Sequence, residues 1–143
     1  WSAVILIGSM LALGVAMEQT GTARYVAGHI AEAVGHLGPR WLLAAFFVLT
    51  VVLTQVMSNQ AAAVVVLPVA METAHQLGLA GRPFAMLIAI AASCSYLTPL
   101  EPSCLLVYGP GGYKFSDFPR YGGVLTLIIG AMAVAWVPTV WPI

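Results

Sequence analysis

Long apolar runs, separated by short polar stretches, make up most of this sequence. The first run lies within 1–20 and the last within 120–143, and each approaches the length of about 20 residues that an apolar helix needs to cross a bilayer. Between them lie a short segment with helical periodicity, 24–38, and two apolar regions that polar residues interrupt, 41–74 and 83–108. The pattern predicts an all-α membrane protein.

Charged residues are too few to cover a surface that faces water. Of the 143 residues, 61% are hydrophobic and 7% are charged, whereas soluble domains carry about 25% charged residues. The formal net charge is zero, so nothing indicates a nucleic-acid partner. The chain opens on Trp1 inside an apolar run, without the charged leader and cleavage site of a signal peptide. We expect it to be part of a longer protein.

Residues 24–38 have the periodicity of an amphipathic helix. Val26, Ile30 and Val34 recur at helical spacing, which predicts a helix lying in the plane of the membrane. The polar face carries His29, Glu32 and His36. Their spacing is compatible with a metal site, but a solvated face or contact with lipid headgroups is favoured.

A polar triplet, Ser58-Asn59-Gln60, interrupts the apolar region 41–74, which as one straight helix would be longer than a bilayer is thick. Two shorter helices that meet at the triplet would form a re-entrant hairpin, entering and leaving the membrane on one side. Irregular backbone is tolerated at membrane depth only where protein or a water-filled cavity covers it. Ser58 or Asn59 would cap the second helix, whose positive end would then point toward an anion.

Two prolines interrupt the second of these regions, in the stretch "TPLEPSC". Pro99 and Pro102 each lack an amide donor and clash with the preceding turn, so the helix must open there. The opening exposes backbone carbonyls between Ser95 and Pro99, which suit a sodium ion. Thr98 and Ser103 add hydroxyl groups for the ion or for a substrate. The hydroxyl of Ser95 is equally suited to bonding its own helix backbone.

Glu101 places a carboxyl group between the two prolines. An ionisable side chain inside an apolar segment is a functional candidate by default. A buried carboxyl group tends to stay protonated unless it is paired, which would suit proton coupling or a cation site. The alternative is a structural ion pair with a basic residue in sequence not present here.

No residue pattern indicates an enzyme or a structural metal. Cys94 and Cys104 lie in apolar sequence and are interpreted as buried small side chains, not as a disulfide or a metal pair. No Ser, His and acid fall at helical spacing within one apolar segment, and there is no phosphate-binding loop or metalloprotease motif. We expect neither catalytic nor metal-ligating residues.

The order of these motifs resembles one family of membrane transporters. The stretch "MSNQAAAVVVLPVA", followed by "IAASCSYLTPLEPSCLLVYGPGGYKFSDFPRYG", looks like the C-terminal repeat of the divalent anion:sodium symporters. These are the sodium/sulfate and sodium/dicarboxylate carriers of the ion transporter superfamily. The likeness covers nearly the whole chain, from "LIGSMLALGVAMEQTG" to the closing "WPI".

The resemblance implies an elevator-type transporter made of two inverted repeats, of which the N-terminal repeat is missing here. It also implies a homodimer in which a transport domain moves against a scaffold. In that architecture the segments are a scaffold-side helix (1–20), an arm helix (24–38), the re-entrant hairpin (41–74), the broken transmembrane helix (83–108) and the final transmembrane helix (120–143).

The resemblance also assigns binding residues. In the family the first two positions of the hairpin motif touch substrate and sodium, and Ser58 and Asn59 match them. The candidate substrate-binding residues are Ser58, Asn59, Gln60, Thr98, Pro99 and Ser103. The candidate sodium-binding residues are Asn59, Ser95 and Thr98, and Glu101 is a candidate proton site. The chain departs from the family pattern at Gln60, which is commonly Thr, at Glu101, and near Cys104, where the family usually has Asn.

The leading hypothesis is the C-terminal half of a sodium-coupled symporter for a small divalent anion, sulfate first and dicarboxylate second, in a bacterial inner membrane. Its partners would be the bilayer, the anion, the N-terminal repeat and a second copy. One alternative is a proton-coupled carrier or antiporter that uses Glu101. Another is a partial membrane protein that does not transport.

Overall fold

The computed structural model describes residues 19–21, 25, 29, 32–34 and 38–142. This described part is helical throughout, with turns between the helices and no strand, as the sequence predicts. The apolar run at 1–20 and the segment 24–38 fall largely outside the described residues, so their placement stays a prediction.

Helices α3 (Pro39–Thr54) and α4 (Asn59–Gln76) form a helical hairpin. Pro39 occupies the first turn of α3, where a missing amide leaves no bond unmade. The chain then turns over residues 55–58, and the Ser58 hydroxyl caps α4 by accepting a hydrogen bond from the Ala61 amide at 3.2 Å. At 1.5 Å per residue the two helices are about 24 and 27 Å long.

Helix α5 (Gly81–Ala92) follows α4 after a short turn and runs antiparallel to it. It ends after 12 residues, and the chain stays non-helical over residues 93–101. Helix α6 (Pro102–Tyr108) begins directly at Pro102, because a proline fits the first turn of a helix and not its interior. Residues 93–101 are called the break segment below.

A π-helical turn, η2 (Phe118–Gly122), leads without interruption into α7 (Gly123–Val140). Together they form a helix of 23 residues, Phe118–Val140, which is long and apolar enough to cross a membrane. Only 22% of its apolar window is buried within the described residues. Helices α3 and α5 are also apolar but shorter.

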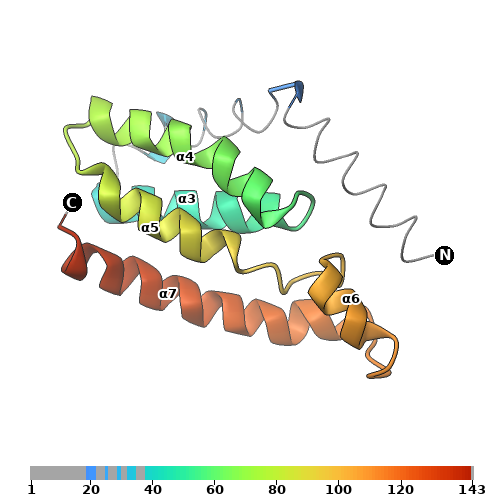
Figure 1. Ribbon diagram of the computed structural model, residues 1–143. Coiled ribbons are helices and arrows are strands. Elements are labelled where there is room, and N and C mark those ends of the chain that lie inside the picture. Colours follow the sequence, from blue (N-terminus) through green and yellow to red (C-terminus); the bar gives the residue numbers. More distant parts are fainter. Residues whose placement is uncertain (1–18, 22–24, 26–28, 30–31, 35–37, 143) are drawn as a thin grey trace.

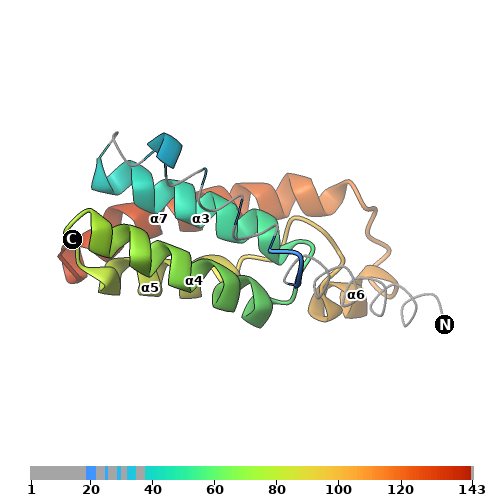
Figure 2. The same ribbon diagram turned by 90° about the horizontal axis from the view of Figure 1, so that it is seen from above.

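Helices α3, α4 and α5 pack against one another, and α7 lies along α3 and α5 (Figures 1 and 2). Large side chains from α3 and α5 meet in the core, where the rings of Phe46 and Phe84 pack edge to face with centroids 6.0 Å apart. Helix α4 contributes mostly small buried side chains on one face, namely Ala62, Val66, Ala70 and Ala74. Small residues at a spacing of four let helix backbones approach closely in membrane proteins.

Two glycines bring α7 and η2 close to the other helices. A Cβ atom on Gly130 would lie 2.7 Å from the ring of Phe47. A Cβ atom on Gly122 would overlap the carbonyl oxygen of Tyr96, in the break segment. The absence of side chains at these positions therefore fixes how α7 packs against α3 and how η2 packs against the break segment.

Candidate functional site

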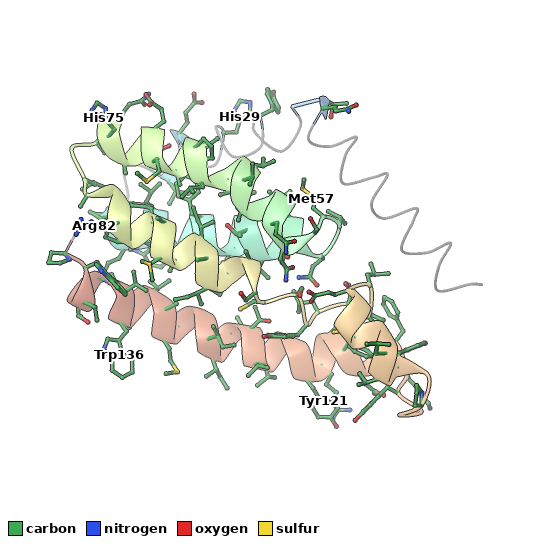
Figure 3. All side chains as sticks on the ribbon, in the orientation of Figure 1. His29, Met57, His75, Arg82, Tyr121 and Trp136 are labelled. Atoms are coloured by element: carbon green, nitrogen blue, oxygen red, sulfur yellow. The ribbon has the colours of Figure 1, made fainter. Side chains whose placement is uncertain are left out.

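The hairpin tip, residues 54–60, and the break segment lie at the same end of the helix bundle. This follows from topology, because α4 and α5 are antiparallel, so the start of α4 lies beside the end of α5. In Figure 3, Met57 marks this end, and His75 and Arg82 mark the opposite end. The two interruptions predicted from the sequence therefore meet.

The carboxylate of Glu101 joins the two interruptions. The Asn59 side-chain amide donates to its Oε1 atom at 2.9 Å, and the hydroxyl of Ser95 donates to its Oε2 atom. Glu101 is half-buried, and Ser95 is 2% exposed. One carboxylate oxygen is thus held from α4 and the other from the break segment.

Thr54 orients this contact from the end of α3. Its hydroxyl oxygen lies 2.5 Å from Asn59 Oδ1 and 3.1 Å from the carbonyl oxygen of Ala92. A hydroxyl has one proton to donate, so these two acceptors share it. With Asn59 Oδ1 turned toward Thr54, the amide nitrogen of Asn59 faces Glu101.

Gln55 links the last turn of α3 to the break segment. The last carbonyls of a helix have no partner within that helix. The Gln55 amide nitrogen donates to the carbonyl of Cys94 at 3.2 Å and to that of Val51 at 2.8 Å. Its Oε1 atom accepts from the hydroxyl of Thr98 at 3.3 Å. A single side chain of the hairpin tip therefore contacts both ends of the stretch from Cys94 to Thr98.

Thr54 and Gln55 are the residues that reading the sequence missed. They belong to the apolar run that precedes the triplet. The available signal was a pair of polar residues four and five positions before Asn59, in a run where the surrounding residues are hydrocarbon. Polar residues beside a helix interruption within an apolar segment are candidates for the same site.

The structure places the other predicted site residues as follows. Ser58 and Gln60 are exposed at the start of α4, and Pro99 is buried in the break segment. The side chain of Ser103 lies outside what the structure describes. Asn59, Ser95 and Thr98 are therefore joined to the network around Glu101 and Gln55, whereas Ser58 and Gln60 are exposed beside it.

The surroundings of Glu101 and the exposed start of α4 differ in electrostatic character. Near Glu101 the groups are carboxylate, hydroxyl, amide and carbonyl oxygens together with the negative C-terminal end of α5. Among the described residues no Lys, Arg or His pairs with Glu101. The ion pair between His29 and Glu32, exposed and 3.7 Å apart, does not involve it. Oxygen ligands of this kind suit a hard cation. The exposed start of α4 offers the opposite sign, because amides point outward from a helix N-terminus.

The two cysteines flank Ser95 without bonding to each other. Cys94 is buried, and its Sγ atom lies 3.4 Å from the carbonyl oxygen of Ile90. The Sγ atom of Cys104 lies 3.9 Å from the carbonyl oxygen of Ser95. No group of three or more His, Cys, Asp or Glu side chains arranged to hold a metal is present in the part of the chain that the structure describes.

An apolar helical chain with two helix interruptions brought together by polar side chains is typical of secondary membrane transporters. The comparison with known proteins agrees. The sequence profile of the citrate transporter family matches residues 1–143, and the chain belongs to this family. The family comprises integral multi-pass membrane transporters, and it is not a family of enzymes.

Several curated proteins are similar to the chain. An uncharacterised transporter of Synechocystis sp. is 41% identical over 130 residues, covering 90% of this chain and 21% of that protein. A probable sodium/sulfate cotransporter 3 of Chlamydomonas reinhardtii is 29% identical, covering 85% of the chain and 14% of that protein. A sodium-dependent high-affinity dicarboxylate transporter 3 of Caenorhabditis elegans is 27% identical, covering 98% and 25%.

These relatives confirm the resemblance to the divalent anion:sodium symporters. The chain spans about a fifth of the length of the Synechocystis relative (21%) and a quarter of the Caenorhabditis relative (25%). What the whole proteins transport is therefore considered below as a proposal for this chain.

Proposed function

We propose that the chain forms the C-terminal half of a sodium-coupled symporter for small divalent anions, with sulfate as the first candidate and a dicarboxylate as the second. The observation that carries the proposal is the contact between the two helix interruptions through Asn59, Glu101 and Ser95. Transporters place ion and substrate sites where interrupted helices meet. The names of two relatives, a sodium/sulfate and a sodium-dependent dicarboxylate transporter, support the same class of substrate.

The sodium ion would bind on the oxygen-rich side of this contact. Asn59, Ser95 and Thr98 are the proposed ligands from the family pattern, and Thr54 brings a further hydroxyl oxygen into the same network. The C-terminal end of α5 adds partial negative charge. The ionised carboxylate of Glu101 would hold the ligands in place and attract the cation.

The anion would bind at the exposed start of α4. Ser58 and Gln60 lie there, and the helix N-terminus presents amides and a positive dipole end. Thr98, Pro99 and Ser103 are the proposed contributions from the broken helix. Glu101 would repel a dianion placed directly against it, so the anion is proposed to lie on the Ser58 side and the sodium ion between the two charges.

The larger architecture is also a proposal. The hairpin of α3 and α4 would enter and leave the membrane on one side, because each helix is shorter than the roughly 30 Å hydrocarbon core. An N-terminal repeat would supply the other half of the site. The assembly would be a homodimer of the elevator type in a bacterial inner membrane.

The test is uptake by proteoliposomes that contain the full-length transporter. Labelled sulfate and labelled succinate are offered separately, with an inward sodium gradient and with equal sodium on both sides. We expect gradient-dependent uptake of one of them, and competition by the unlabelled anion. The proposal would be contradicted if folded protein, reconstituted in the proteoliposomes, showed no sodium-dependent uptake of any dianion offered.

A further inference from the structure

The middle of the break segment is not held by its own backbone. Residues 95–97 make no backbone–backbone hydrogen bond to another described residue. Their carbonyl oxygens, together with the hydroxyls of Ser95 and Thr98, are the groups that an interrupted helix offers to a cation. The positions of these oxygens therefore depend on the side chains that contact the segment.

Gln55 bonds to both sides of this stretch. Its Nε2 atom donates to the Cys94 carbonyl at 3.2 Å, and its Oε1 atom accepts from the Thr98 hydroxyl at 3.3 Å. A further bond from Nε2, to the Val51 carbonyl at 2.8 Å, anchors the amide to its own helix. Because a side-chain amide is planar and rigid, these bonds hold Cys94 and Thr98 at one separation.

The bond to Gln55 also orients the Thr98 hydroxyl. A hydroxyl carries one proton and two acceptor lone pairs. With the proton directed at Gln55, both lone pairs remain for a cation. Gln55 itself is uncharged and half-buried, and both polar ends of its amide already have partners. It is therefore suited to positioning the ligands of a cation and not to serving as one.

Resting on the sodium site of the proposed function, we propose that Gln55 is a positioning residue that sets the affinity of this site for sodium and its preference for sodium over lithium. Oxygen sites select between hard cations by cavity size, ligand number and flexibility. The Gln55 amide restricts the flexibility, because it fixes the separation of the two ends of the stretch. Replacing a group that orients metal ligands in this way typically lowers metal affinity about 10- to 100-fold.

Titration of the unfolding temperature of the purified full-length transporter tests the proposal. Sodium or lithium chloride is added without sulfate or dicarboxylate, and choline chloride keeps the ionic strength constant. An ion that binds only the folded protein raises the unfolding temperature as its concentration rises, so the midpoint of the rise reports its affinity. Gln55→Met keeps the length of the side chain and removes its hydrogen bonds. We expect the sodium midpoint to rise about 10- to 100-fold, and the preference for sodium over lithium to fall.

Gln76→Met is the matched control. Gln76 is exposed at the other end of α4, where its Nε2 atom donates to Glu72 Oε1 at 2.9 Å. The same substitution there should leave the sodium midpoint unchanged. If the role of Gln55 were only structural, Gln55→Met would lower the unfolding temperature equally in every salt. An unchanged sodium midpoint and an unchanged preference over lithium would overturn the proposal.

A second variant covers the case in which Gln55→Met does not fold. Gln55→Asn keeps the amide on a side chain one carbon shorter, which should no longer contact Cys94 and Thr98 together, so the sodium midpoint should again rise. The proposal would be overturned if neither variant folded, or if sodium stabilised the wild-type protein no more than choline does.

The titration and the uptake assay can fail separately. The titration uses no transported anion, so it measures the sodium site whether or not a dianion is taken up. Failure of uptake for every dianion would contradict the symporter, while a sodium midpoint that depends on Gln55 would still support the positioning role. Sodium-dependent uptake with a midpoint that does not respond to Gln55→Met would overturn only the positioning role.

Discussion

Glu101 bonds to two segments that lie far apart in the sequence, with Asn59 on one oxygen and Ser95 on the other. At the scale of single residues this is the contact on which the proposed site depends. A carboxylate held on both sides restricts how the hairpin tip and the break segment can move apart. Thr54 and Gln55 support the same junction from α3.

Replacing Asn59 with Ala should disrupt the junction. The change leaves an oxygen of Glu101 without its donor and the Thr54 hydroxyl without one acceptor. Losing a hydrogen bond costs about 0.5–1.5 kcal/mol, and sodium-dependent uptake should fall at least tenfold if Asn59 is also an ion ligand. Thermal unfolding and uptake of the purified full-length protein measure both.

The control is Gln60→Ala at the neighbouring position. Gln60 is exposed, and surface substitutions usually change stability by less than about 0.5 kcal/mol. Equal loss of stability in both variants would show that the junction does not depend on Asn59.

Glu101 can be tested for charge and for bonding separately. In Glu101→Gln the side chain keeps an acceptor for Asn59 and gains a donor for the Ser95 hydroxyl, whereas Glu101→Ala loses both. We expect the Ala variant to be less stable than the Gln variant by about 1–3 kcal/mol. If the carboxylate charge also attracts sodium, the Gln variant should remain folded but need more sodium for half-maximal uptake.

The same Gln variant addresses the proton-coupled alternative. A carrier that uses Glu101 as its proton site would lose the pH dependence of uptake in Glu101→Gln. Uptake with an unchanged response to pH would remove Glu101 from that role.

At the scale of elements, the helix interruptions have different origins. Pro99 and Pro102 make the opening between α5 and α6 predictable, because proline removes a donor and clashes with the preceding turn. The turn before α4 has no proline, and the capping hydroxyl of Ser58 marks it. The π-helical turn η2 was not expected from the sequence, and its last residue, Gly122, packs against the backbone of Tyr96.

Adding one methyl group to Gly122 should displace the break segment. In Gly122→Ala the new Cβ atom would overlap the Tyr96 carbonyl oxygen, which is backbone and cannot rotate away. Overpacking of this kind costs about 1–3 kcal/mol, and uptake should fall because Ser95 and Glu101 move with the segment. The unfolding temperature and the uptake rate of the full-length protein report the two effects.

Gly123→Ala is the matched control. Its Cβ atom would lie 3.6 Å from the Leu97 Cδ2 atom, an ordinary contact distance. Both changes favour the helix to a similar extent, because alanine is a better helix former than glycine. If the two variants behaved alike, close packing at Gly122 would not be what positions the break segment.

At the scale of the whole molecule, the arrangement of helices predicts a membrane topology. The start of α3 and the end of α4 lie at the end of the bundle opposite to the hairpin tip (Figure 1). If the hairpin is re-entrant, both of these ends face the same side of the membrane, and the loop after α6 faces the other side.

Single cysteines test this topology in the full-length transporter after Cys94 and Cys104 are replaced with Ala. Cysteines introduced at Arg40, Gln76 and Lys114, all exposed, are labelled with a reagent that does not cross the bilayer. We expect positions 40 and 76 to react from one side and position 114 from the other. Reaction of 40 and 76 from opposite sides would mean that α3 and α4 do not form a re-entrant hairpin.

The sequence by itself determined the class of the protein and the places where helices stop. Apolar runs, proline and capping residues act on their own segment over one or two turns, so they can be interpreted without knowing the fold. Their order also carries the resemblance that the family match confirms.

Only the tertiary structure decided which polar groups meet. Asn59 and Glu101 are 42 positions apart, and Gln55 and Thr98 are 43 apart. Their contacts exist because α4 turns back on α3 and α5 turns back on α4, which brings the hairpin tip beside the end of α5. A local pattern does not specify such contacts, since they depend on how whole helices pack.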